Sequence, residues 1–203
     1  LPDEVVSMIG NSTIDFYPWE HIYAKVNKLN WHPRKTVELG ASTSKWLSDV
    51  AAENFSSENA VDYVLWHFGK DGYTIDGLYP LNDEPNVVFN ILQNYEPKYY
   101  GENYVLFGRN ESPRTIRVIG GEKSIAKLNE WISVPDCGNN IQRVKVETGV
   151  TFAGFMKKTF FKDEMYFVDY MTDDGEMYSY RYVPSTAVDG LWVNPLVTRF
   201  VDG

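Results

Sequence analysis

Carboxylates and histidines are the residues of this chain whose types could support acid–base chemistry. Glu20 and Asp76 lie close to the ends of predicted strands, and a glycosidase needs two carboxylates at a defined separation. The three histidines, His21, His32 and His67, show no HxxxH or HxH spacing. The sequence therefore predicts no metal site. A carbohydrate-active enzyme that uses Glu20 and Asp76 as an acid–base pair remains an alternative function.

Nucleophilic and cofactor chemistry have no support in the sequence. There is no GxSxG motif, and Cys137 has no evident histidine base. Because Cys137 is the single cysteine, an intrachain disulfide and a CxxC zinc site are both excluded. No GxGxxG motif follows the first predicted strand. We therefore assign no catalytic residue and no cofactor.

Composition limits the classes of partner. The 203 residues carry a net charge of −9, and no cluster of lysine and arginine is present, so nucleic acid is not an expected partner. Aromatic residues make up 15%, which fits a β-rich core or a carbohydrate-facing surface. No run of 18 apolar residues occurs, so the sequence predicts no membrane span. The chain begins at Leu1 rather than methionine, which indicates a piece of a longer protein.

Strands and helices are expected to alternate in the first half. Residues rich in β-branched and aromatic side chains predict strands at 13–17, 34–39 and 61–68. Apolar residues at helical spacing predict helices that begin at Pro18, after the small polar loop 40–44, and at Asn82 or Asp83 with Pro85 in the first turn. Residues 98–100 and 104–109 predict a closing hairpin. This pattern is typical of a Rossmann-like three-layer α/β fold with a mostly parallel sheet.

The pattern changes after the polar turn at 110–114. Strands are expected at 115–119, 141–148, 154–161, 165–172, 177–183 and 191–193, with a short helix or irregular crossing at 122–130. The Asp174-Gly175 pair between two apolar runs is the strongest hairpin signal in the chain. The sequence therefore predicts an α/β domain over residues 1–112 and an antiparallel β-sandwich domain over residues 113–203.

The expected binding site lies beyond the carboxyl ends of the predicted parallel strands, where open α/β sheets bind ligands. These ends carry Trp19 and Glu20, the loop 40–44 and the loop 69–82. Glu20 also has a purely structural interpretation, because an acidic residue in a helix's first turn stabilises the helix dipole. Aromatic faces combined with charged hydrogen-bonding groups suit a sugar. The candidate ligand-binding residues are Trp19, Glu20, His21, Arg34, Asp76 and Tyr79.

Several motifs resemble the soluble tail of a group of bacterial multi-span membrane proteins that look like glycosyltransferases of the lipid-linked-sugar class. The similar stretches are IDFYPWE, WHPRKTVE, ENAVDYVLWHF, IDGLYPLNDEP and NYVLFGRN. The pattern departs at Leu78, where the group has an arginine, and at 38–43, which reads ELGAST. The resemblance implies a non-catalytic, extracytoplasmic binding or docking region, tethered to the membrane in the full-length protein. Its expected partners are that protein's own membrane segments and a glycan or lipid-linked sugar; a purely structural spacer is a further alternative.

Overall fold

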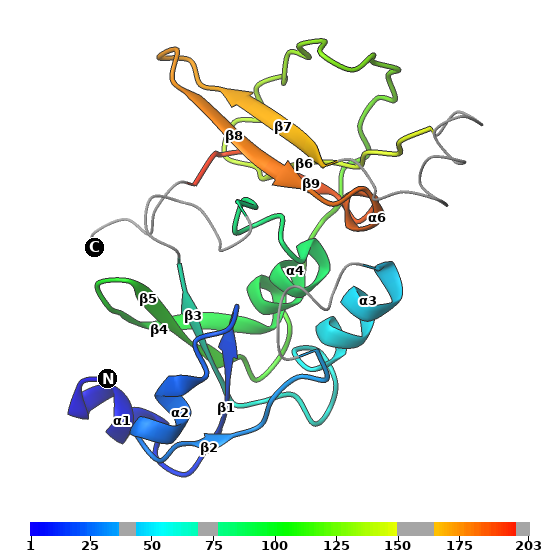
Figure 1. Ribbon diagram of the computed structural model, residues 1–203. Coiled ribbons are helices and arrows are strands. Elements are labelled where there is room, and N and C mark those ends of the chain that lie inside the picture. Colours follow the sequence, from blue (N-terminus) through cyan, green and yellow to red (C-terminus); the bar gives the residue numbers. More distant parts are fainter. Residues whose placement is uncertain (37–43, 69–76, 150–164, 198–203) are drawn as a thin grey trace.

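The computed structural model describes residues 1–36, 44–68, 77–149 and 165–197. In these ranges the protein is mixed α/β, with one five-stranded sheet and two two-stranded antiparallel sheets (Figure 1). The five-stranded sheet lies at one end of the molecule and the small sheets lie at the other (Figure 1). No helix of the described ranges has the length and apolarity needed to cross a bilayer.

The five-stranded sheet has the strand order β2-β1-β3-β5-β4. Its strands are β1 (Thr13–Tyr17), β2 (Asn30–Trp31), β3 (Tyr63–His67), β4 (Tyr95–Tyr100) and β5 (Tyr104–Arg109). β2, β1 and β3 are parallel, whereas β5 runs antiparallel to β3 and β4 antiparallel to β5. The predicted closing hairpin is confirmed as β4–β5. Because that hairpin joins the sheet through β5, the sheet is mixed rather than mostly parallel.

Helices cover both faces of this sheet. Ile14, Phe16 and Leu65 point to the face covered by α1 (Asp3–Ile9) and α2 (Ile22–Val26). The neighbouring residues on the strands point to the opposite face, which is covered by α3 (Lys45–Glu53) and α4 (Pro85–Asn94). This division follows from the strand geometry, which turns successive side chains to opposite faces. Two apolar cores result, one on each side of the sheet.

Helix starts agree only partly with the sequence. α4 begins with Pro85 in its first position, as predicted, and Ser44 caps α3 by accepting a hydrogen bond from the Leu47 amide at 3.3 Å. The predicted helix start at Pro18 is wrong, because α2 begins at Ile22. The Pro18 carbonyl accepts a hydrogen bond from the Arg34 side chain, in the irregular stretch between β1 and α2.

The second predicted strand is also displaced. β2 lies at Asn30–Trp31, and Arg34 to Thr36 lie outside any strand, while residues 37–39 are outside the described ranges. Neither Asn82 nor Asp83 caps α4; the residue before its first turn is Glu84, whose side chain makes no capping hydrogen bond. Local capping patterns therefore located α4 but misassigned its cap, because Asn82 is engaged with residues far along the chain.

The second half contains β6 (Gln142–Val144), β7 (Tyr166–Met171), β8 (Met177–Tyr182), α6 (Pro184–Ala187) and β9 (Leu191–Asn194). β7 and β8 form the hairpin predicted at Asp174-Gly175, and β6 pairs with β9. The predicted strand 115–119 is wrong, and residues 122–130 form the irregular crossing rather than the short helix, because residues 111–136 are exposed and have no regular structure. Their apolar side chains have no partner surface in the described chain. The predicted strand 154–161 lies outside the described residues.

The two halves share one of the apolar cores. Tyr170, Tyr180 and Trp192 pack in the same cluster as Tyr79 and Leu81. Arg181 donates its amide to the Gly77 carbonyl at 2.9 Å, and an isolated parallel bridge joins Leu78 to Arg181. The predicted division at residues 112 and 113 is thus crossed by a continuous buried interface.

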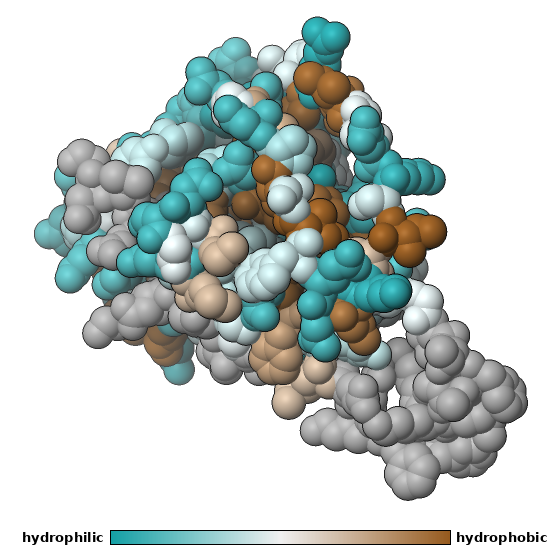
Figure 2. Space-filling view, turned by 90° about the horizontal axis from the view of Figure 1, so that it is seen from above, coloured by the Kyte–Doolittle hydropathy of each residue, from teal (hydrophilic) through white to brown (hydrophobic). Residues whose placement is uncertain are grey.

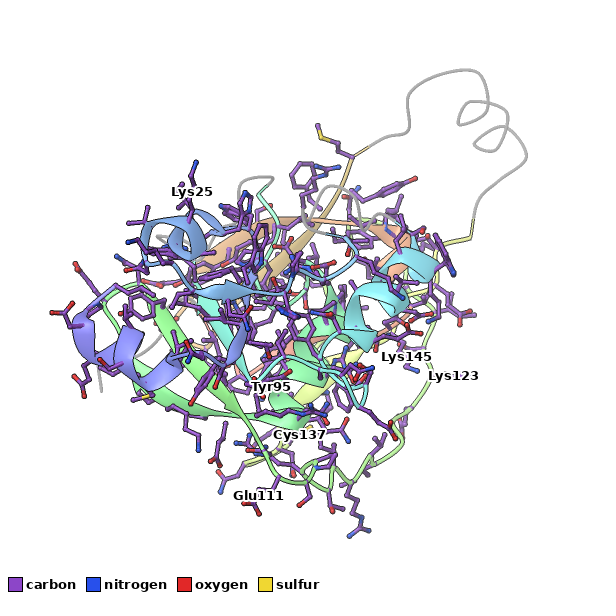
Figure 3. All side chains as sticks on the ribbon, turned by 90° about the horizontal axis from the view of Figure 1, so that it is seen from below. Lys25, Tyr95, Glu111, Lys123, Cys137 and Lys145 are labelled. Atoms are coloured by element: carbon purple, nitrogen blue, oxygen red, sulfur yellow. The ribbon has the colours of Figure 1, made fainter. Side chains whose placement is uncertain are left out.

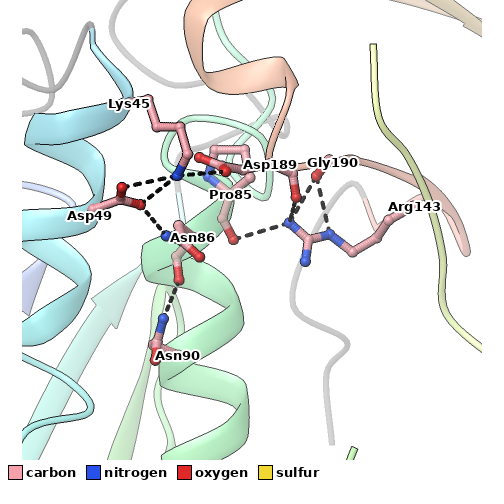
Figure 4. A network of polar contacts seen from close by, with 8 residues as sticks. All are labelled: Lys45, Asp49, Pro85, Asn86, Asn90, Arg143, Asp189 and Gly190. Atoms are coloured by element: carbon pink, nitrogen blue, oxygen red, sulfur yellow. Dashed lines mark hydrogen bonds and ion pairs between the residues drawn. The ribbon is translucent and has the colours of Figure 1, made fainter. Parts of the chain in front are cut away.

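A polar network reinforces this interface from outside (Figure 4). Lys45 of α3 binds Asp49 at 2.9 Å and Asp189, which precedes β9, at 3.2 Å. The Arg143 guanidinium of β6 donates to the carbonyls of Asp189 and Gly190 at 2.9 Å and of Pro85 at 3.3 Å. These contacts tie the start of α4 and the start of α3 to the β6–β9 sheet.

Candidate functional site

Arg34 lies at the centre of the candidate site and is only 1% exposed. Its guanidinium donates hydrogen bonds to the carbonyls of Phe16, at 2.9 Å, and Pro18, at 2.5 Å, where β1 ends. The same group lies 3.7 Å from the Asp15 carboxylate and 3.8 Å from the Glu84 carboxylate. A buried cation with this many oxygen partners holds the end of β1 in place. Arg34 cannot reach a ligand at the surface.

Asp15 completes this buried arrangement from the middle of β1. Its carboxylate accepts hydrogen bonds from the Phe16 amide at 2.9 Å, the Arg34 amide at 3.1 Å and the Trp31 indole at 3.1 Å. The Asn54 side chain, after α3, donates a longer one at 3.4 Å. Burial raises the pKa of Asp15, while Arg34 and these hydrogen bonds lower it in part. The carboxylate therefore has a structural role in joining β1, β2 and α3.

Tyr17 links the Arg34 cluster to the start of α4. The Arg34 guanidinium lies over its ring, 5.3 Å from the centroid. Burial raises the pKa of Tyr17 well above its usual value, and the nearby charges of Glu84 and Asp83 raise it further. Asp83 and Glu84 are themselves buried at the N-terminal end of α4, where the helix dipole favours negative charge. The arrangement is a closed ionic cluster beneath the surface.

Above this cluster lies a partly exposed rim, which we define as Trp19, Glu20, His21, Trp31 and His67. The His21 ring stacks on the Trp31 ring with centroids 5.3 Å apart and an angle of 4° between the planes. The first three of these residues follow β1 and the last ends β3, so two parallel strands contribute to one edge.

The charge of Glu20 acts on His67 across this rim. Burial lowers the pKa of His67, because the imidazolium loses hydration, and the negative charge of Glu20 opposes that change. The rim therefore combines aromatic faces with one carboxylate and one imidazole that is neutral at pH 7.

The remaining predicted site residues do not join the rim. Tyr79 is fully buried in the core shared by the two halves, with its ring centroid 5.0 Å from that of Tyr180 and 6.0 Å from that of Tyr170. Its hydroxyl accepts a hydrogen bond from the Val197 amide at 2.8 Å, and burial raises its pKa. Asp76 lies outside the described residues. Of the six candidates, the structure brings Trp19, Glu20 and His21 together above Arg34.

Sequence reasoning missed Trp31 and His67 as rim residues. His67 ends a predicted parallel strand, so its position relative to β1 was available as a signal. The sequence did not indicate Trp31, because its strand has only two residues and is too short to show a strand pattern. This strand pairs with β1 at Thr13 and Ile14. No group of histidine, cysteine, aspartate and glutamate side chains in the described ranges is arranged to hold a metal ion.

In comparisons with known proteins, no protein-family model, curated protein or solved structure matches this chain. The described residues form a mixed α/β protein in which the charged cluster of Asp15, Arg34 and Glu84 is buried and the partly exposed rim lies near the ends of β1 and β3.

Proposed function

We propose that this chain is a non-catalytic binding and docking region that takes a sugar-type ligand on the rim. The observation that carries this proposal is the burial of Arg34, which is 1% exposed and whose two terminal nitrogens bind the Phe16 and Pro18 carbonyls beneath the rim. A catalytic cation must touch the reacting atoms, whereas this one binds backbone carbonyls and buried carboxylates. What remains accessible is a set of aromatic faces and hydrogen-bonding groups.

Sugar chemistry fits that set. A pyranose ring offers apolar CH faces that pack on aromatic rings, and hydroxyl groups that both donate and accept hydrogen bonds. Trp19 and the stacked His21–Trp31 pair supply the faces, and Glu20 supplies an acceptor. The hydrogen bonds of Arg34 to the Phe16 and Pro18 carbonyls hold the end of β1 beneath the rim, and a site that is ordered before binding loses less entropy.

We further assign the chain to the extracytoplasmic side of a bacterial membrane protein, with that protein's membrane segments as neighbours and a glycan or lipid-linked sugar as ligand. The support is the resemblance of the IDFYPWE and IDGLYPLNDEP stretches to such tails. A Rossmann-like domain at 1–112 is supported by the parallel β2-β1-β3 strands with helices on both faces. A β-sandwich domain at 113–203 is supported by the two antiparallel sheets.

Calorimetric titration with a panel of bacterial oligosaccharides tests the sugar proposal. We expect binding that is weakened about tenfold or more by Trp19→Ala, because stacking on an indole is a main source of sugar affinity. Trp131→Ala is the matched control, since Trp131 is exposed and lies in the irregular segment far along the chain. The absence of any binding sugar, or equal losses in both variants, would contradict the proposal.

A second candidate is a carbohydrate-active enzyme, and the observation that favours it is the shared position of Glu20 and His67. A carboxylate and a neutral imidazole at one edge could act as an acid–base pair. Hydrolysis of aryl glycosides that is lost in Glu20→Gln, with sugar binding retained, would establish this activity and overturn the non-catalytic assignment.

A further inference from the structure

The irregular segment of residues 114–134 exposes large apolar side chains to solvent. Each of six is more than half exposed, from 55% for Trp131 to complete exposure for Ile125. The six are Val118, Ile119, Ile125, Leu128, Trp131 and Ile132. Figure 2 views the end of the molecule that carries this segment, and apolar side chains there lie among hydrophilic ones. Exposed apolar surface of this extent marks an interaction site.

The same segment concentrates positive charge in an acidic chain. Residues 114–134 hold four basic residues, Arg114, Arg117, Lys123 and Lys127, and two acidic ones, Glu122 and Glu130, so the segment has a net charge of +2 in a chain that carries −9. Among the described residues, the side chains of Arg117, Lys123 and Lys127 take part in no ion pair. These three cations are therefore available to a negatively charged surface.

We propose that the segment 114–134 docks the protein on an anionic lipid surface. Basic side chains interleaved with aliphatic residues and a tryptophan are the combination that binds the headgroup boundary of a bilayer. The apolar residues enter the boundary, the tryptophan lies at headgroup depth, and the cations pair with lipid phosphates. Charge complementarity therefore favours an anionic membrane, and this surface is separate from the sugar-binding rim.

The segment lies at one end of the molecule (Figure 1). The segment arches beside the small sheets, at the end of the molecule opposite α1 and α2 (Figure 1). Figure 3 shows Lys123 of the segment and Lys25 of α2 on opposite sides of the molecule. Charges separated by more than the Debye length of about 8 Å at physiological ionic strength are largely screened. Acidic residues of the body that lie farther than this from the segment therefore weaken the local attraction little.

Binding of the whole chain to lipid vesicles tests this inference. We expect sedimentation with vesicles of phosphatidylcholine and phosphatidylglycerol in equal parts, weakened by added salt, and little with pure phosphatidylcholine. A blue shift of tryptophan fluorescence on binding, lost in Trp131→Phe, places the segment at the lipid. Replacing Arg117, Lys123 and Lys127 together with glutamine should weaken binding about a hundredfold.

A triple variant of Lys25, Lys28 and Lys35 to glutamine is the matched control, because it removes the same charge from exposed lysines elsewhere. Equal losses in the two triple variants, or no binding to anionic vesicles, would overturn the proposal. Reversible self-association that is abolished by the segment variant, without vesicle binding, would also overturn it and identify a second copy as the partner. Trp19→Ala should leave vesicle binding unchanged, so this test and the sugar titration can fail independently.

Discussion

Arg34 has a structural role in the candidate site rather than a ligand-binding one. Its position next to β1 suggests a ligand contact, yet its hydrogen bonds run to Phe16 and Pro18 and its ion pairs to Asp15 and Glu84. Desolvating a guanidinium is costly, and only several oxygen partners offset that cost. The buried cluster therefore positions the residues of the rim and does not itself contact a ligand.

Arg34→Met tests this structural role. The substitution leaves two buried carboxylates, on Asp15 and Glu84, without their cation, so we expect the free energy of unfolding to fall by about 3–5 kcal/mol. Urea denaturation followed by circular dichroism measures the change. Lys35→Met is the control, with an expected change within about 0.5 kcal/mol, because its ion pair with Glu53 is exposed. Similar losses for both variants would refute the structural role.

The β7–β8 hairpin depends on local turn chemistry. Gly175 has φ of +85°, a conformation that side chains with a Cβ adopt only with strain. Asp174 accepts hydrogen bonds from the Thr172 hydroxyl and the Glu176 amide, and both lower its pKa. The hairpin carries Tyr170 and Tyr180 into the shared core, so its turn affects the packing of both halves.

Gly175→Ala should reduce the free energy of unfolding by about 1–2 kcal/mol through backbone strain alone. No atom lies within 4 Å of the place that the alanine Cβ would occupy, so steric contact adds nothing. Gly121→Ala provides the comparison, because that position has open space and no positive φ. Thermal unfolding of the two variants measures the difference, and equal midpoints would show that the turn conformation does not contribute.

Across the molecule, Asn82 joins parts of the chain that are far apart in sequence. Its side-chain oxygen accepts the Trp192 amide at 2.6 Å, and its nitrogen donates to the Tyr170 hydroxyl at 2.9 Å. That hydroxyl in turn donates to the Trp192 carbonyl at 3.1 Å. Burial raises the pKa of Tyr170 to about 12, so the hydroxyl remains protonated and keeps donating at neutral pH. The three residues form a closed polar ring inside the shared core.

Asn82→Ala should lower the free energy of unfolding by about 2–4 kcal/mol, because it leaves the buried Trp192 amide unsatisfied and takes one partner from the Tyr170 hydroxyl. Near-ultraviolet circular dichroism should lose intensity as Tyr170 and Trp192 become less ordered. Asn90→Ala is the matched control, since Asn90 donates only to a backbone carbonyl within α4. If both variants unfold alike, the ring does not hold the halves together.

Features that depend on a few neighbouring residues were predictable. The β4–β5 and β7–β8 hairpins and the start of α4 at Pro85 all matched, because turn and proline preferences act within a few residues of the chain. The position of Glu20 after β1 followed from the same local patterns.

Features that depend on distant contacts were decided by the tertiary structure. Arg34 reaches residues 16 to 19 positions away, and Asn82 bonds to Trp192 across 110 positions. The Pro18 carbonyl binds Arg34 where a helix start was predicted, and Asn82 bonds to Trp192 and Tyr170 instead of capping α4. Tyr79 is buried by packing against Tyr170 and Tyr180. The absence of a partner surface within the described ranges left residues 114–134 irregular, although the pattern predicts a strand at 115–119 and either a short helix or an irregular crossing at 122–130. Burial and hydrogen-bond pairing depend on the folded chain as a whole. Where they conflict with the helix or strand propensity of a short segment, they determine the structure.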